Sequence, residues 1–209
     1  WTNPADIVSG TALDSTQLNA TADVPGTFTY APAAGSVLAA GTNQLLTVDF
    51  TPADGHYSGA SATAAINVSR AALTLSVDNA TRAYGAANPT LSGSLSGLTN
   101  NDAITASFTT ATTPTSPTGS YPISAVLSDP ASRLDNYTLT THAGTLTITP
   151  AEQSIAFGAL PARTYGQTPF TVSASAGSGL PVLFTSLTPS VVTVSGDLVT
   201  IVGPGTATL

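Results

Sequence analysis

Apolar and polar residues alternate with a period of two along much of the chain. Four segments place Leu, Ile, Val, Phe or Ala at every second position, with mostly Thr, Ser or Asp between them: Leu46–Phe50, Leu73–Val77, Leu146–Thr149 and Phe170–Ala174. Because successive side chains of a strand point to opposite faces, each segment predicts a β-strand with one buried face. Thr is β-branched, so it keeps strand propensity high on the solvent face without adding charge.

This alternation also predicts which side chains form the cores. Thr147 and Thr149 are expected to face water, and truncating Ile66 or Ile148 to Ala is expected to cost about 2 to 5 kcal/mol. The residues that we expect to be buried are Phe50, Ile66, Val68, Leu75, Val77, Ile123, Leu139, Leu146, Ile148, Phe157 and Val172.

Turn signals separate the predicted strands at short intervals. Examples are Pro25-Gly26, Asp54-Gly55, Asn88-Pro89 and Gly203-Pro204-Gly205. No stretch of ten residues combines a helical period with capping residues, and the short apolar run Val37–Ala40 is ambiguous between a helical turn and a strand. Short strands with regular turns predict an all-β fold of the sandwich or barrel kind.

The sequence repeats itself at intervals of about 80 residues, which is the signature of an array of similar units. Ser154–Gly166 resembles Leu75–Gly85, and Ile7–Gly10 is a fainter copy. Tyr57 and Tyr137 are 80 positions apart, and each precedes an alternating strand. We therefore expect tandem immunoglobulin-like β-sandwiches in a linear array, with units at residues 1–70, 71–150 and 151–209.

The junctions near Arg70 and Pro150 pass from one predicted strand to the next without a Gly/Ser run, so we expect semi-rigid joints. The third unit is expected to be unfinished, because the counterpart of Tyr137 would lie beyond Leu209. Either this segment is cut from a longer chain, which we favour, or a neighbouring subunit supplies the missing strand, as in fibres built by strand exchange.

Composition narrows the function classes. Only 7% of residues are charged, and four basic residues, all Arg, against eleven acids give a net charge of -7, which disfavours nucleic acid as a partner. The chain has no Cys, so disulfides, thiolate chemistry and Cys-based zinc sites are excluded within it, and no Lys is present for an amide cross-link. No apolar run reaches the length of a membrane span. A Thr-rich chain without Lys favours an extracellular or cell-surface location, with any signal or anchor outside these residues.

Several residues are candidates for metal or catalytic sites. The turn Asp54–Tyr57 contains one of the two histidines, and His142 is isolated. Tyr57 and Tyr137 are interpreted as tyrosines before a late strand whose hydroxyls bond the backbone, as in the tyrosine corner of immunoglobulin-type sandwiches. Asn100–Asp102 together with Asp129 and Asp135 are loose acidic clusters that turn chemistry explains, since Asn and Asp bond their own backbone in loops.

Aromatic and nucleophilic residues give no stronger signal. Trp1 with Tyr30, or Tyr84 with Tyr165, would offer rings to a sugar, but Tyr84 and Tyr165 both precede Gly and favour a shared structural role. A Ser-His-Asp triad has no Gly-x-Ser-x-Gly motif to support it. The sequons at Asn19, Asn67, Asn79 and Asn136 are interpreted as coincidental. We expect no enzyme activity, and no catalytic, cofactor-binding or metal-binding residues.

The middle of the chain resembles the MBG ("mostly beta, glycine-rich") domain over residues 71–150. The family often has Tyr-Gly-Asp where this chain has Tyr84-Gly85-Ala86. The segments that carry the resemblance are Val77–Pro89, Ser96–Asp102, Pro117–Ile123, Asp135–Tyr137 and Gly144–Pro150.

The flanking residues 1–70 and 151–209 resemble immunoglobulin-like repeats of large bacterial surface proteins, most closely at Gly179–Val182 and Val191–Leu209. The resemblance implies a stalk, spacer or fibre segment of an adhesin, with neighbouring repeats and other copies as partners. The alternatives are a glycan- or protein-binding module, a filament subunit assembled by strand exchange and, as a third class, an enzyme accessory or remote hydrolase.

Overall fold

The computed structural model describes residues 1–209. Apart from one short 3₁₀ helix, Leu134–Asn136, the regular structure consists entirely of β-strands, so the predicted all-β fold is confirmed. The structure contains no helix of the length and apolarity that a membrane crossing requires. The chain divides into two compact units, Trp1–Thr149 and Pro150–Leu209.

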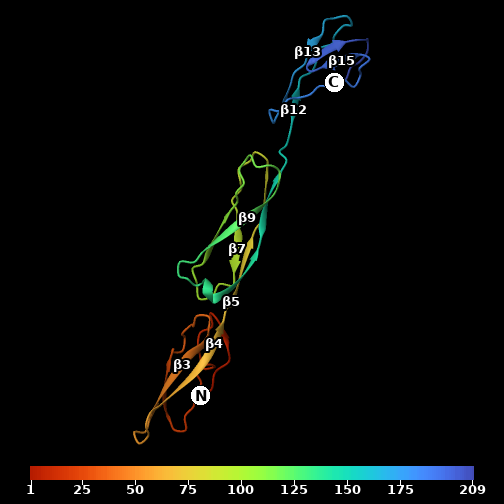
Figure 1. Ribbon diagram of the computed structural model, residues 1–209. Helices are drawn as coiled ribbons and strands as arrows, with labels where there is room; N and C mark the ends of the chain where they lie inside the picture. The colour runs from red at the N-terminus through yellow and green to blue at the C-terminus, as the bar shows by residue number, and fades with distance from the viewer. The chain divides into compact units, whose positions relative to one another are not determined.

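Residues 1–70 form one four-stranded sheet in the order β1-β4-β3-β2. Its two longest strands, β3 and β4, lie side by side in Figure 1. β1 pairs in parallel with β4, and the other neighbours are antiparallel. A register shift between Gly41 and Gln44 bends the start of β3, where Asn43 has a positive φ of 52°. The strands are β1 (Ile7–Val8), β2 (Gly26–Ala31), β3 (Gly41–Pro52) and β4 (Ala60–Ser69).

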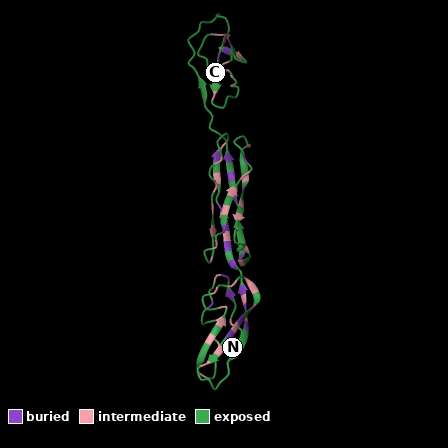
Figure 2. Cartoon of the chain, turned by 90° about the vertical axis from the view of Figure 1, so that its left-hand side faces the viewer, coloured by how far each residue is buried: buried purple, intermediate pink, exposed green.

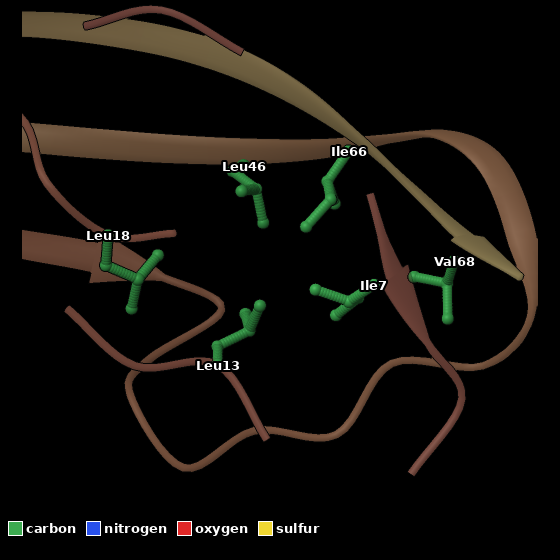
Figure 3. Packing of buried hydrophobic residues seen from close by; sticks show 6 residues of the cluster. All are labelled: Ile7, Leu13, Leu18, Leu46, Ile66 and Val68. Atoms are coloured by element: carbon green, nitrogen blue, oxygen red, sulfur yellow. The ribbon is translucent and has the colours of Figure 1, made fainter. Parts of the chain in front are cut away.

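One face of this sheet is covered by irregular chain. Leu46 on β3 and Ile66 on β4 are almost fully buried against Leu13 and Leu18, which come from the loop after β1 (Figure 3). The only β-bridge in this irregular chain is the isolated antiparallel bridge between Ala12 and Val37, so Val37 is not in a helical turn. Because no regular second sheet forms here, the assignment of residues 1–70 to an immunoglobulin-like sandwich stays a prediction.

Residues 71–149 form two sheets, in the orders β10-β5-β7 and β6-β11-β9-β8. Side chains of both sheets meet in shared clusters, for example Val77 of β5 with Ile123 of β9 and Leu146 of β11. The strands are β5 (Ala71–Val77), β6 (Ala80–Ala83), β7 (Gly93–Ser96), β8 (Thr105–Thr109), β9 (Gly119–Ser128), β10 (Tyr137–His142) and β11 (Gly144–Thr149).

Burial alternates along these strands as the sequence pattern predicts (Figure 2). Leu146 and Ile148 are 0% and 2% exposed, whereas Thr147 and Thr149 are exposed. The predicted register of this strand is therefore confirmed.

Unit Pro150–Leu209 contains a two-stranded sheet, β12-β14, and a three-stranded sheet, β13-β16-β15. Its core is small and consists of Val172, Val192 and Val199. The single strand predicted over Phe170–Ala174 is interrupted after Thr171. The strands are β12 (Ile155–Phe157), β13 (Phe170–Thr171), β14 (Ala174–Ala176), β15 (Val192–Ser195) and β16 (Leu198–Ile201).

Three of the predicted core residues differ from expectation. Leu139 is 44% exposed because it lies on β10, an edge strand with β5 as its only neighbour. Phe157 is 41% exposed on β12, which also has one neighbour. Phe50 is half-buried, with its ring against that of Phe28 on the neighbouring strand. The eight confirmed positions are Ile66, Val68, Leu75, Val77, Ile123, Leu146, Ile148 and Val172.

Candidate force-bearing strands

The first two strands of residues 71–149 pair in parallel with the last two strands of this segment. β10 pairs with β5 from Tyr137↔Ala71 onward, and β11 pairs with β6 up to Thr149↔Ala83. The offset between partners is the same in both sheets, since 137 − 71 = 66 and 149 − 83 = 66. We call these two paired segments the parallel ladder.

The ladder stays in register while it steps from one sheet to the other. Gly144 makes the step possible, because a Cβ at this position would lie 2.6 Å from the carbonyl oxygens of both Val77 and Asp78. Asn79 replaces the ladder hydrogen bonds that are lost at the step, since its Oδ1 accepts the backbone N–H of Thr145 at 2.8 Å. Both strands therefore change sheets together.

This geometry determines how tension along the chain acts on the fold. The chain enters the ladder at Ala71 and leaves it at Thr149, and these residues lie at opposite ends of the paired segments. Pulling on the two ends slides one segment along the other, so the interstrand bonds share the force. Breaking several bonds of about 1 kcal/mol together is harder than breaking them one after another.

The far end of the ladder is fastened by a buried arginine. Arg82 is 6% exposed, its Nε donates to Asn88 Oδ1 at 2.7 Å, and a terminal nitrogen donates to the carbonyl of Thr113. Asn88 in turn donates to the carbonyl of Thr112 at 2.8 Å, which ties the loop after β8 to the end of β6. The sequence reading missed this role, although the recurrence of Arg82 at Arg163, each two positions before Tyr-Gly, was an available signal.

Residues 1–70 show the same arrangement in a shorter form. β1 runs parallel to the last residues of β4. The pairing extends toward the N-terminus through side chains, because Asn3 Oδ1 accepts the N–H of Ala65 at 2.9 Å and Asp6 Oδ1 accepts from Asn67 Nδ2 at 3.0 Å. The entering and leaving segments of this part are thus also joined in parallel.

Tyr137 anchors the start of β10, where the ladder meets the loop Thr99–Asp102. Its buried hydroxyl accepts the N–H of Thr99 at 3.0 Å and donates to Asp102 Oδ2 at 2.7 Å. The predicted hydroxyl-to-backbone bond is therefore present for Tyr137. It is wrong for Tyr57, whose side chain is 56% exposed to solvent rather than placed under the sheet.

Residues 1–70 and 71–149 touch at this same place. Gly10 lies so close to Thr99 that an added Cβ would be 2.7 Å from it, and the N–H of Ala40 donates to Asn136 Oδ1 at 2.9 Å. Asn136 directly precedes Tyr137 in the chain, and the backbone N–H of Thr99 donates to the Tyr137 hydroxyl. The contact between residues 1–70 and 71–149 therefore lies at the start of the parallel ladder.

The candidate histidines and acids lie in turns or at strand ends. His56 Nδ1 is 2.6 Å from Asp54 Oδ1, and the backbone N–H of His56, followed by its side chain, lowers the pKa of Asp54. His142 is exposed at the end of β10. No group of three or more His, Cys, Asp or Glu side chains is close enough to hold a metal ion.

The acidic loops form turn structures. Asn100 and Asn101 have positive φ angles of 55° and 53°, a conformation that Asn tolerates better than most residues. The backbone N–H groups of Arg133 and then Leu134 lower the pKa of Asp129. Asp135 is exposed in the 3₁₀ helix.

The aromatic candidates divide into two groups. Tyr84 and Tyr165 are both exposed and precede Gly85 and Gly166, whose φ angles are +83° and +93°, so both form the same turn. Trp1 instead packs edge-on against Tyr30 with ring centroids 5.5 Å apart.

The rings near Trp1 line a groove of about 440 Å³ at the open end of the first sheet. Its lining includes Phe28 and Phe50, whose ring centroids are 4.9 Å apart, together with Tyr57.

Three of the four sequon asparagines accept a backbone N–H with their side-chain oxygen: Asn67, Asn79 and Asn136.

Comparison with known protein families identifies the central segment. Residues 73–147 match the MBG domain of the YGX type. The predicted MBG resemblance is confirmed for this segment, which contains nearly the whole parallel ladder and the tripeptide Tyr84-Gly85-Ala86. MBG domains are β-rich domains of surface proteins and are a structural family not known for enzymatic activity. No match was found among curated proteins.

Proposed function

We propose that this chain is an extracellular, force-bearing spacer segment in the stalk or fibre of a large bacterial surface protein or adhesin. The observation that carries the proposal is the parallel ladder of the MBG domain, with six residue pairs between β5 and β10 and four between β6 and β11. A spacer exposed to flow must resist extension along its chain, and a ladder loaded in shear resists in that direction.

Three further observations support this role. Residues 1–70 join their entering and leaving segments in parallel as well, and their contact with the MBG domain is fastened at Asn136. The surface owes its polarity to Thr and Ser rather than to charge. Neighbouring repeats of the same kind are the partners that such a segment requires.

Pulling the 209-residue chain from its two ends in an atomic force microscope tests the proposal. Unit Pro150–Leu209 serves as an internal control, since its β12 pairs only with the antiparallel β14. We expect the step that releases residues 71–149 to need more force than the step that releases residues 150–209. The lengths of released chain tell the two steps apart. A lower or equal force for residues 71–149 would contradict the proposed role.

A second candidate function is glycan binding, favoured by the aromatic groove of residues 1–70. Phe28, Phe50 and Tyr57 supply aromatic rings to its lining, and Asp23 and Ser58 supply hydrogen-bonding groups. Titration with neutral oligosaccharides, followed by the fluorescence of Trp1, tests it. Saturable quenching that Tyr57→Ser removes would support glycan binding, and an unchanged spectrum at millimolar sugar would exclude it.

A further inference from the structure

Tension along the chain does not load the parallel ladder evenly. Because each segment stretches slightly under load, the residue pairs at the two ends of a joint loaded in shear carry more force than the pairs between them. At one end the pull enters at Ala71, which pairs with Tyr137. At the other end the pull leaves at Thr149, which pairs with Ala83. Separation of the ladder therefore begins at these two end pairs.

An end pair resists only while the partner of the pulled residue stays in place. Tyr137 is this partner at one end and Ala83 at the other, and each lies on the segment that is not pulled at that end. A partner that is free to follow the pulled residue passes the load to the next pair along the ladder. A bond from the partner to a part of the domain outside the ladder therefore strengthens the end pair.

Tyr137 has such a bond. Its ring is 4% exposed and packs in one cluster with Ala71 and Ile104. Its hydroxyl accepts the N–H of Thr99 at 3.0 Å and donates to Asp102 Oδ2 at 2.7 Å. The loop that carries these two partners connects β7 with β8, and neither strand belongs to the ladder. The hydroxyl thus fastens the first end pair to the rest of the domain.

The other end pair is fastened through Arg82, which directly precedes Ala83. Arg82 donates from Nη1 to the carbonyl of Ala83 at 3.1 Å, and from its other nitrogens to Asn88 Oδ1 and to the carbonyl of Thr113. Thr113 lies after β8, outside the ladder. The planar guanidinium holds these acceptors in a fixed arrangement. Both ends of the ladder therefore have the same design, in which the partner of the pulled residue is tied to a loop outside it.

We propose that Tyr137 and Arg82 are the two residues that set the mechanical resistance of the MBG domain. We call them the anchor residues. Their side-chain hydrogen bonds break in the first step of unfolding under tension, while the core between the two sheets is still packed. This inference rests on the proposed force-bearing role and adds the residues on which that role depends.

Unfolding of the 209-residue chain at constant force in an atomic force microscope tests the proposal. The variants are Tyr137→Phe, which removes only the hydroxyl, and Arg82→Met. Each is expected to raise the rate at which residues 71–149 are released at least about fivefold, because bonds that are broken in the transition state no longer slow unfolding. The length of released chain identifies this step.

Ile123→Val is the control, since Ile123 is 5% exposed in the core and lies on β9, which is not a strand of the ladder. Its release rate is expected to rise less than about twofold, because the core stays packed in the transition state. Urea unfolding measures the stability of every variant, and Ile123→Ala replaces Ile123→Val if a larger loss is needed to match the anchor variants. Equal rises in release rate for anchor and control variants of equal stability would overturn the proposal.

Two further variants keep the test decisive if an anchor variant does not fold. Asn88→Ala removes an acceptor of Arg82, and Asp102→Ala removes the acceptor of the Tyr137 hydroxyl, while both anchor residues stay in place. Both are expected to speed release as the anchor variants do, and Asp102→Asn, which keeps a side-chain oxygen, is expected to speed it less than Asp102→Ala. Release rates at the parent level for Asn88→Ala and Asp102→Ala would refute the anchoring role.

The parent chain separates this inference from the proposed function. If residues 71–149 of the parent need no more force than residues 150–209, the force-bearing role itself fails, and the anchor residues have no load to bear. If the parent resists as proposed but the anchor variants behave like the Ile123 control, the force-bearing role stands and only the assignment of the anchor residues is refuted.

Discussion

Truncation of Leu146 to Ala is the most informative stability test of the MBG domain. Leu146 is 0% exposed, and its side chain packs with Val77 and Ile123 between the two sheets. Its strand, β11, is held by hydrogen-bonded neighbours on both sides, β6 and β9. The backbone therefore cannot move inward to fill the space that the truncation leaves.

The cost follows from the lost transfer free energy and the cavity. Removing three carbon atoms from a fully buried side chain forfeits about 2.4 kcal/mol at ~0.8 kcal/mol per methylene. An unrelaxed cavity adds to this loss, so we expect Leu146→Ala to lower the free energy of unfolding of the domain by about 3 to 5 kcal/mol. Thr147→Ala, one position away on the exposed face, is expected to cost about 1 kcal/mol or less.

Urea unfolding followed by hydrogen exchange at the amides of β9 and β11 measures these values. The chain contains more than one compact unit, so a probe confined to the domain is needed to avoid mixing transitions. A loss below about 1 kcal/mol for Leu146→Ala, or equal losses for the two variants, would show that this face of β11 does not carry the core.

Three further predictions concern polar groups. Tyr137→Phe is expected to destabilise the domain by about 1 to 3 kcal/mol in urea unfolding, because it leaves a backbone N–H unpaired, while Tyr57→Phe changes stability by less than about 0.5 kcal/mol. Arg82→Met is expected to cost about 2 kcal/mol or more and Arg163→Met less than about 1 kcal/mol, and similar losses would refute the fastening role of Arg82. The pKa of Asp129 is lowered in the folded state, so its stabilisation is complete above about pH 4 and is lost as the pH falls through the folded pKa. The stability of Asp129→Asn should therefore vary less with pH in acid, and an unchanged acid profile would refute this contribution.

The alternation of apolar residues made the strand faces predictable. It placed Leu146 and Ile148 inside and Thr147 outside, because a side-chain period of two fixes the face of every residue once one face is buried. It was wrong for Leu139 and Phe157, because alternation does not say whether a strand lies at the centre or the edge of a sheet.

The candidate site was less predictable than the strands. A period-two pattern gives no information about which strand is the neighbour, so the parallel pairing of β5 with β10 and of β6 with β11 could not be read from it. The burial of Arg82 depends on acceptors at Asn88 and Thr113, and the latter lies 31 positions away. The recurrence of Tyr84 and Tyr165 before Gly did predict a shared structural role, and the structure shows that this role is a turn decided by the local backbone.

Pulling the same domain in two directions tests the central claim most directly. The chain has no native Cys, so single cysteines attach the handles at chosen exposed sites. Ala72→Cys with Thr149→Cys loads the parallel ladder in shear, whereas Ala72→Cys with Thr138→Cys pulls a directly paired position apart and opens the ladder from one end. We predict a higher unfolding force for the first pair at every loading rate. Equal forces in the two directions would contradict the claim that the ladder resists tension along the chain.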